Sequence, residues 1–162
     1  MTKHPDVRVI LSGDPAEAME AAKRIIEHED VDIHTLTDIA TNETCAKWSR
    51  VAAIYTLGFI DDKSKSARAL TRILANRNED QECRAHAAEA LGHMEEPKAI
   101  SVMAKILMAE DSPEVKKWCV YALTELGGSE TRSILEQFAT TTPTGTLADE
   151  LRLALSPQGH ES

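Results

Sequence analysis

Along most of this chain, hydrophobic residues recur among polar ones with a period close to that of an α-helix. The clearest example is residues 84–92, whose inward positions are Ala85, Ala87, Ala88 and Leu91. An earlier helix is predicted to follow Asp14, which suits an N-cap, and Pro15, which suits a first helical position. A second is predicted over residues 33–40. Before Asp14 the pattern offers only a brief apolar patch at residues 9–11.

The pattern repeats. The pairs Leu57-Gly58, Leu91-Gly92 and Leu126-Gly127 are spaced by 34 and 35 residues, and each closes an apolar helical stripe. Each glycine is predicted to end its helix in a left-handed conformation, which glycine adopts at little cost. A second helix follows each pair, with inward residues such as Leu70, Met103 and Leu135.

Two helices per unit of this length predict a stack of helical hairpins whose core is completed by neighbouring units. We therefore expect an all-α fold, an α-solenoid of about four stacked antiparallel hairpins with a C-terminal capping helix over residues 147–155. Residues 1–155 are expected to form a single domain, and residues 156–162 a flexible C-terminal tail.

The motif Arg84-x-x-Ala87-Ala88-x-Ala90-Leu91-Gly92 resembles the short HEAT-like repeat of the phycocyanobilin lyase type. The match extends to Arg50-x-x-Ala53-Ile54-x-x-Leu57-Gly58 and, more weakly, to residues 117–127, so that it covers residues 45–140. The resemblance implies a HEAT-like solenoid. It does not specify a function, because that superfamily contains bilin lyases and chaperones, deoxyhypusine hydroxylase, and many bacterial scaffolds and adaptors.

The hydroxylase carries a His-Glu pair on several repeats to hold two irons. Here the corresponding positions read Ala85-His86 and Val51-Ala52, while His28-Glu29 and His160-Glu161 fall at a helix end and in the tail. His86, Glu89 and His93 share one helical face, but the two histidines are about 10 Å apart along the helix, too far to share one ion. We interpret them as an exposed polar ridge, and expect neither a metal nor another cofactor.

Composition argues against several further classes of function. The chain has 162 residues, with 18 basic and 27 acidic side chains and a net charge of −9. A phosphate backbone needs a basic footprint, so we expect no bulk nucleic-acid binding. No apolar run reaches the roughly 18 residues of a membrane span, and no secretory signal is visible. Three cysteines without a CxxC motif favour reduced thiols, and with them a cytoplasmic location.

Two sets of residues are candidates for binding a partner. The first is an aromatic and polar ridge beside the apolar stripe of the first helices: Trp48, Tyr55, His86, Glu89, Trp118 and Tyr121. In the register of the glycines, His86 and Tyr121 are equivalent to Ala52. The second is a basic strip on the second helices, expected on the concave side: Lys65, Arg68, Arg72, Lys98 and Lys105. The alternatives are rings packed between hairpins, and an ordinary solvated face.

These features favour a non-enzymatic protein–protein interaction module, such as a small scaffold, adaptor, inhibitor or immunity-type protein. Its partner is expected to be a protein, and an acidic one if it uses the basic strip. The alternative is a ligand-handling or enzymatic HEAT-like protein, for instance a bilin lyase-like or chaperone subunit. A DNA-repair glycosylase built on similar repeats would need a basic groove, against which the net charge argues.

Overall fold

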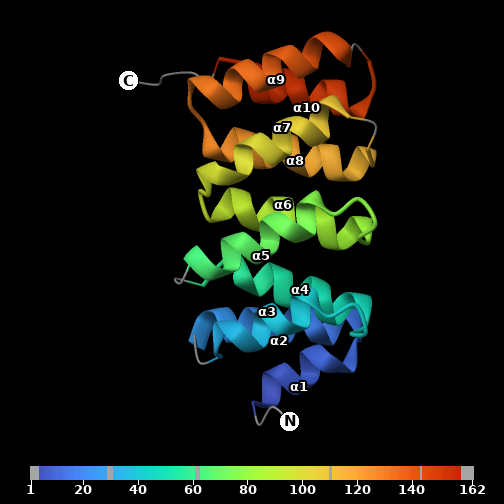
Figure 1. The fold of residues 1–162 in the computed structure, drawn as a ribbon, viewed down its shortest axis with the longest axis vertical. Helices are drawn as coiled ribbons and strands as arrows, with labels where there is room; N and C mark the ends of the chain where they lie inside the picture. Colours follow the sequence, from blue (N-terminus) through green and yellow to red (C-terminus); the bar gives the residue numbers. More distant parts are fainter. Residues whose placement is uncertain (1–3, 29–30, 61–62, 110, 143, 158–162) are drawn as a thin grey trace.

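The computed structural model is a stack of helices running from the N-terminal to the C-terminal end (Figure 1). It describes residues 4–28, 31–60, 63–109, 111–142 and 144–157. In these ranges every regular element is helical: α1 (Pro5–Ser12), α2 (Pro15–His28), α3 (Ile33–Thr41), α4 (Lys47–Leu57), α5 (Lys63–Ala75), α6 (Gln81–His93), the 3₁₀ turn η1 (Pro97–Ala99), α7 (Ile100–Met108), α8 (Pro113–Leu126), α9 (Ser129–Thr141) and α10 (Thr146–Leu155).

The helices form two layers. The first layer contains α2, α4, α6, α8 and α10, each packed against the next, and the second contains α3, α5, α7 and α9 (Figure 1). The hairpins α2–α3, α4–α5, α6–α7 and α8–α9 are therefore stacked in order, and α10 packs on both α8 and α9. The predicted all-α solenoid with a C-terminal capping helix is confirmed. In the described parts, no helix is long and apolar enough to cross a membrane.

The core is one continuous ribbon of buried side chains from α1 to α10. Its N-terminal end differs from the sequence prediction, because the brief apolar patch belongs to α1. Val7 and Ile10 of this helix are fully buried, and the helix packs on α2 and α4. An eight-residue helix has too few turns to show a clear period, so only the packing reveals it. Glu29, His160 and Glu161, and most of the predicted tail, lie outside the described residues.

The register of the third unit has to be corrected. Cys83, Ala87, Ala88, Ala90 and Leu91 of α6 are buried, and the same pattern returns 32 residues later. The buried residues of α8 are Val115, Cys119, Val120, Ala122 and Leu123. Leu91-Gly92 is therefore equivalent to Leu123-Thr124, and Leu126-Gly127 closes an extra turn of α8. As a consequence, Trp118 is equivalent to His86, and Tyr121 is equivalent to Glu89.

The predicted role of the repeated glycine holds only in part, because Gly58 and Gly127 end their helices but Gly92 does not. Gly58 has a right-handed φ of −71°, and Gly92 lies inside α6. A Cβ on Gly58 would lie 2.9 Å from the Cα of Ala90, and one on Gly92 would lie 2.9 Å from the Cα of Ala122. These glycines let neighbouring first helices approach closely. Of the three, only Gly127 has a positive φ, of 62°, at the end of its helix.

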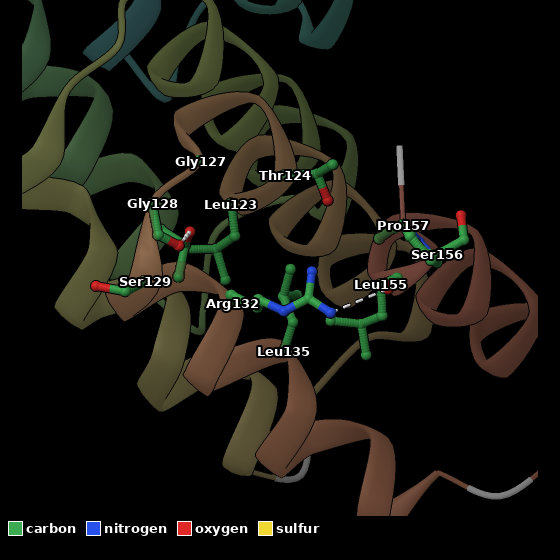
Figure 2. A pocket seen from close by; sticks show the side chains of 12 residues that line it. Leu123, Thr124, Gly127, Gly128, Ser129, Arg132, Leu135, Leu155, Ser156 and Pro157 are labelled. Carbon is green, nitrogen blue, oxygen red and sulfur yellow. Dashed lines mark hydrogen bonds between the residues drawn. The ribbon is translucent and has the colours of Figure 1, made fainter. Parts of the chain in front are cut away.

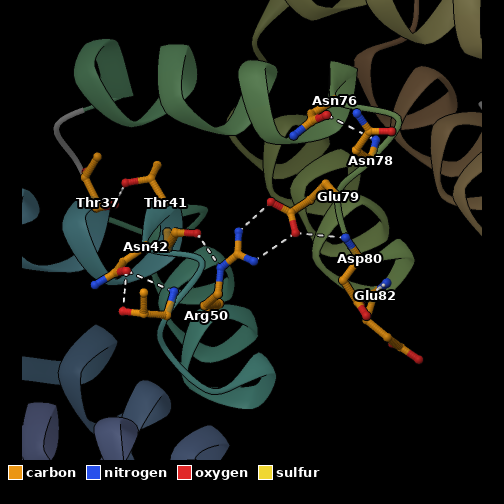
Figure 3. A network of polar contacts seen from close by, with 11 residues as sticks. Thr37, Thr41, Asn42, Arg50, Asn76, Asn78, Glu79, Asp80 and Glu82 are labelled. Carbon is orange, nitrogen blue, oxygen red and sulfur yellow. Dashed lines mark hydrogen bonds and ion pairs between the residues drawn. The ribbon is translucent and has the colours of Figure 1, made fainter.

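A buried arginine joins successive units (Figure 3). Arg50 on α4 donates through Nε to the carbonyl of Ala40 at 3.1 Å and through both terminal nitrogens to Glu79. Arg84 on α6 repeats the arrangement with the carbonyl of Leu74 at 3.0 Å and with Asp111 at 2.6 and 2.7 Å. Each arginine lies on a first helix. It connects that helix to the end of the preceding second helix and to the loop before the following first helix.

We call this arrangement, an arginine bonded to a backbone carbonyl and to a carboxylate, the arginine clamp. The clamp is absent from the next described unit. The residue four positions after the N-cap is Arg50 in α4 and Arg84 in α6, but Lys116 in α8. The Lys116 ammonium lies 5.6 Å from the centre of the Phe138 ring instead. The cation of α8 therefore makes a cation–π interaction with α9, whereas Arg50 and Arg84 make a bidentate ion pair with the loop before the following first helix.

The two clamps predict a loss of stability in acid. Hydrogen bonds from Arg50 and Arg84 hold the pKa of Glu79 and of Asp111 below the usual ranges, against the opposing effect of burial. A carboxyl whose pKa is lower in the folded chain stabilises the fold above its unfolded pKa, and that contribution is lost as the pH falls through the folded pKa. We expect the urea midpoint to be steady near neutrality and to fall below about pH 4. Glu79→Gln should flatten this dependence, and Glu130→Gln, at an exposed position, should not; equal profiles for both variants would contradict the assignment.

The cysteines are sheltered to different degrees. Cys83 and Cys119 are fully buried, and Cys45 is half-buried. Burial raises the pKa of Cys83 to about 11 and that of Cys119 to about 12, so both thiols stay protonated and unreactive near neutral pH.

Candidate functional site

Seven side chains form a connected strip across the first-helix layer, which we call the aromatic strip: Tyr55, Phe59, His93, Glu89, His86, Trp118 and Tyr121. The strip runs from the end of α4 over α6 to α8. At the α4 end, the ring centres of Tyr55 and Phe59 are 4.9 Å apart. Phe59 then meets the His93 ring of α6 at 4.8 Å.

The centre of the strip is the carboxylate of Glu89, between two histidines on the same helix. Nδ1 of His86 lies 2.9 Å from Oε2 of Glu89, and Nε2 of His93 lies 3.9 Å from Oε1. The spacing of three and four residues places all three on one face of α6. The three side chains share one face, as expected, but they are half-buried and do not form the exposed ridge that the sequence predicted. In the described parts no group of side chains is arranged to hold a metal ion.

The α8 end of the strip is built from Trp118 and Tyr121. The His86 ring stacks on Trp118 at 6.3 Å, and Trp118 meets Tyr121 edge-on at 5.6 Å. The indole Nε1–H of Trp118 donates to Glu114 one turn earlier, at 3.0 Å, which fixes the ring. Tyr121 is 46 % exposed and Phe59 is 38 % exposed, so both ends of the strip face solvent.

Five of the six predicted ridge residues are brought together: Tyr55, His86, Glu89, Trp118 and Tyr121. Trp48 is not part of the strip and lies instead beneath the Lys47 ammonium, 5.4 Å from its ring centre. Phe59 was missed because it follows the helix, and His93 was assigned to the polar ridge of residues 86–93 but not to the candidate binding residues. Tyr55 and Trp118 also pack partly against the core, so these rings serve both packing and surface.

The predicted basic residues lie on the second-helix layer. Lys65, Arg68 and Arg72 of α5 are exposed at positions that share a helical face, as are Lys98 of η1 and Lys105 of α7. The buried residues Leu70, Ile73 and Leu74 return as Met103, Ile106 and Leu107 after 33 residues, so Lys65 and Lys98 are equivalent, as predicted. Within the described ranges, none of the five forms an ion pair.

A separate pocket of about 570 Å³ opens at the C-terminal end, between α8, α9 and α10 (Figure 2). Leu123, Leu135 and Leu155 line its apolar side, and Gly127 and Gly128 its rim. The Arg132 guanidinium reaches across the pocket, where it donates to Glu136 at 2.9 Å and to the carbonyl of Leu155 at 3.2 Å. Two of the three guanidinium nitrogens are therefore hydrogen-bonded within the chain.

Comparison with known proteins identifies the repeat. Residues 73–156 match the family described as HEAT repeats. Among solved structures, the complex of CpcE and CpcF of phycocyanin lyase from Nostoc sp. PCC7120 contains a similar chain, with a TM-score of 0.78 and 18 % identity over 93 % of this chain and 96 % of that one. Human deoxyhypusine hydroxylase, in complex with glycerol, gives a TM-score of 0.67 and 18 % identity over 92 % of this chain and 60 % of its own. No curated protein matches the sequence. The TM-scores show a shared fold, and together with the HEAT-repeat match they confirm the resemblance drawn from residues 84–92.

Proposed function

Because this chain belongs to the HEAT-repeat family, we propose that it is a protein-interaction module that binds a protein partner through the aromatic strip. The observation that carries this proposal is the unbroken series of ring and carboxylate contacts across α4, α6 and α8. Tyrosine and tryptophan bury a large area for few rotatable bonds, and they are enriched among residues that dominate binding energy.

The fold comparison supports a protein partner. One similar structure is a complex of two chains, CpcE and CpcF, and this chain spans nearly the whole of the matched chain. A stack of hairpins presents a long side surface in which residues from successive repeats line up. A scaffold, adaptor, inhibitor or immunity-type protein would each use such a surface without a catalytic group.

The basic strip is a second proposed docking surface, for an acidic segment of a partner. Its five cations are exposed, and the net charge of −9 places them against an otherwise acidic molecule. Because these exposed cations have no internal ion pairs to break, little free energy is lost when they bind a carboxylate surface. They also raise the association rate at low salt.

The double substitution Trp118→Ala with Tyr121→Ala should weaken partner binding by at least about tenfold, because it removes two rings of an interface centre. A pull-down from native lysate would identify the partner, and titration with the purified partner would measure the change. Trp48→Ala is the matched control, since this ring lies outside the strip. Unchanged affinity in the double variant, with the circular dichroism spectrum retained, would refute the role of the strip.

The alternative is a ligand-handling protein, as in a bilin lyase-like or chaperone subunit. The pocket at the C-terminal end supports it, because its volume lies within the range of small-molecule sites. Purified protein carrying a pigment would absorb visible light, and Ala154→Arg, at a half-buried position of the pocket wall, would abolish that absorbance. Colourless protein that binds its partner with full affinity would rule this alternative out.

A further inference from the structure

We propose that the partner presents arginine side chains to the aromatic strip, so that the strip recognises a cationic helix or peptide. This inference rests on the proposed function and names the chemistry of the partner at that same surface. Its basis is the combination of carboxylates and aromatic faces on three neighbouring helices.

The outward stripe of the first helices is acidic. It consists of the eleven partly or fully exposed residues at positions 48, 55 and 59 of α4 and its C-terminal turn, 82, 86, 89 and 93 of α6, and 114, 118, 121 and 125 of α8; the equivalent residue Ala52 is buried. Five of these are aromatic, four are glutamate and two are histidine; none is lysine or arginine, although the chain has 18 of these. The stripe therefore attracts cations, in contrast to the basic strip on the second-helix layer.

Glu89 offers the central acceptor. Its Oε2 is bonded to His86, whereas Oε1 is 3.9 Å from His93 and has no hydrogen bond within the described structure. The side chain is 16 % exposed, which places it in a partly desolvated position among rings. A charge-assisted hydrogen bond is stronger in such surroundings than at an open surface.

The rings beside Glu89 supply the second half of the recognition. Trp118 is held by Glu114, so its indole face keeps one orientation, and Glu114 and Glu125 are both exposed on the same stripe. A guanidinium stacks on an aromatic face while its edge donates to a carboxylate. The ammonium of lysine cannot make both contacts with the same geometry.

Nearby charges do not cancel this field. Lys23 on α2 is engaged by Glu20 at 2.7 Å, and Lys47 lies over Trp48, outside the strip. Lys117 precedes Trp118 and points about 100° away around α8. His86 and His93 flank Glu89, and protonation of either would weaken the attraction for a guanidinium.

The experiment uses the full chain labelled with ¹⁵N, since its two tryptophans give two indole N–H signals. The probe is an alanine-based helical peptide with two arginines four residues apart. Matched peptides carry lysine or glutamate at the same positions. We expect the arginine peptide to shift the Trp118 indole signal and leave that of Trp48 unchanged. The lysine peptide should bind several-fold more weakly, and the glutamate peptide should cause no shift.

Glu89→Gln with Glu114→Gln should weaken binding of the arginine peptide by about tenfold, because two charged acceptors become neutral. Glu17→Gln with Glu130→Gln removes the same charge at exposed positions away from the strip and should leave binding unchanged. Equal affinity for the glutamate peptide, equal shifts at both tryptophans, no shift with millimolar arginine peptide, or full binding by the Glu89 and Glu114 variant would each overturn the inference.

The natural partner separates this inference from the proposed function. If the partner is lost on Trp118→Ala with Tyr121→Ala but retained at full affinity by the Glu89 and Glu114 variant, the strip is the docking surface and the arginine inference fails. If the ring variant itself retains the partner, the proposed function fails.

Discussion

Replacing Arg84 with methionine should lower the free energy of unfolding by about 3 kcal/mol, the largest effect that we expect from a single polar residue. Arg84 is nearly fully buried, and so is its partner Asp111, with side-chain exposures of 4 % and 6 %. Methionine fills much of the space but leaves a buried carboxylate without its cation and the carbonyl of Leu74 without its donor. Urea unfolding followed by circular dichroism would measure the change.

Two further variants test this explanation. Lys23→Met removes one partner of an exposed ion pair and should change the stability little. Arg84→Met combined with Asp111→Leu should recover part of the lost stability, because the uncompensated charge is removed as well. If Arg84→Met were as stable as Lys23→Met, the clamp would not be a structural link between repeats.

Replacing Gly92 with valine should lower the free energy of unfolding by about 3 kcal/mol, at the upper end for overpacking. The new Cβ would lie 2.9 Å from the Cα and 3.0 Å from the Cβ of Ala122, and backbone cannot move aside as a flexible side chain can. The two most closely packed helices of the first layer, α6 and α8, would have to separate. Thermal and urea unfolding would record the loss.

The matched control is Ser101→Val, which places the same side chain at an exposed position of α7. Serine and valine have similar helix propensities, and glycine has a lower one, so Ser101→Val should leave the stability nearly unchanged and propensity cannot explain a loss at Gly92. A similar loss for both substitutions would mean that the close approach of α6 and α8 does not explain the effect at Gly92. Gly92→Val should also disturb the aromatic strip, because the contact between His86 and Trp118 joins the same two helices, α6 and α8.

The candidate site was predictable as a set of residues more than as an arrangement. Period and composition identified Tyr55, His86, Glu89, Trp118 and Tyr121 as a ridge beside the apolar stripe. The equivalence between residues of α6 and α8 was misassigned. The reason is that α8 continues one turn past the repeat, so that Leu126-Gly127 resembles the earlier Leu-Gly pairs without being equivalent to them. Phe59 and His93 join the strip only because the end of α4 lies beside the end of α6.

Helical periodicity and the motif at residues 84–92 were sufficient to establish the all-α solenoid, its hairpins and its capping helix. These features depend on local spacing and on a repeated apolar face, which are written along the chain. The close approach between units could not be predicted from local spacing. Gly58 and Gly92 are required by backbone atoms of the next helix, and Arg50 and Arg84 by carboxylates 29 and 27 residues away. Such contacts exist only once the hairpins are stacked, and they set the register in which the aromatic strip forms.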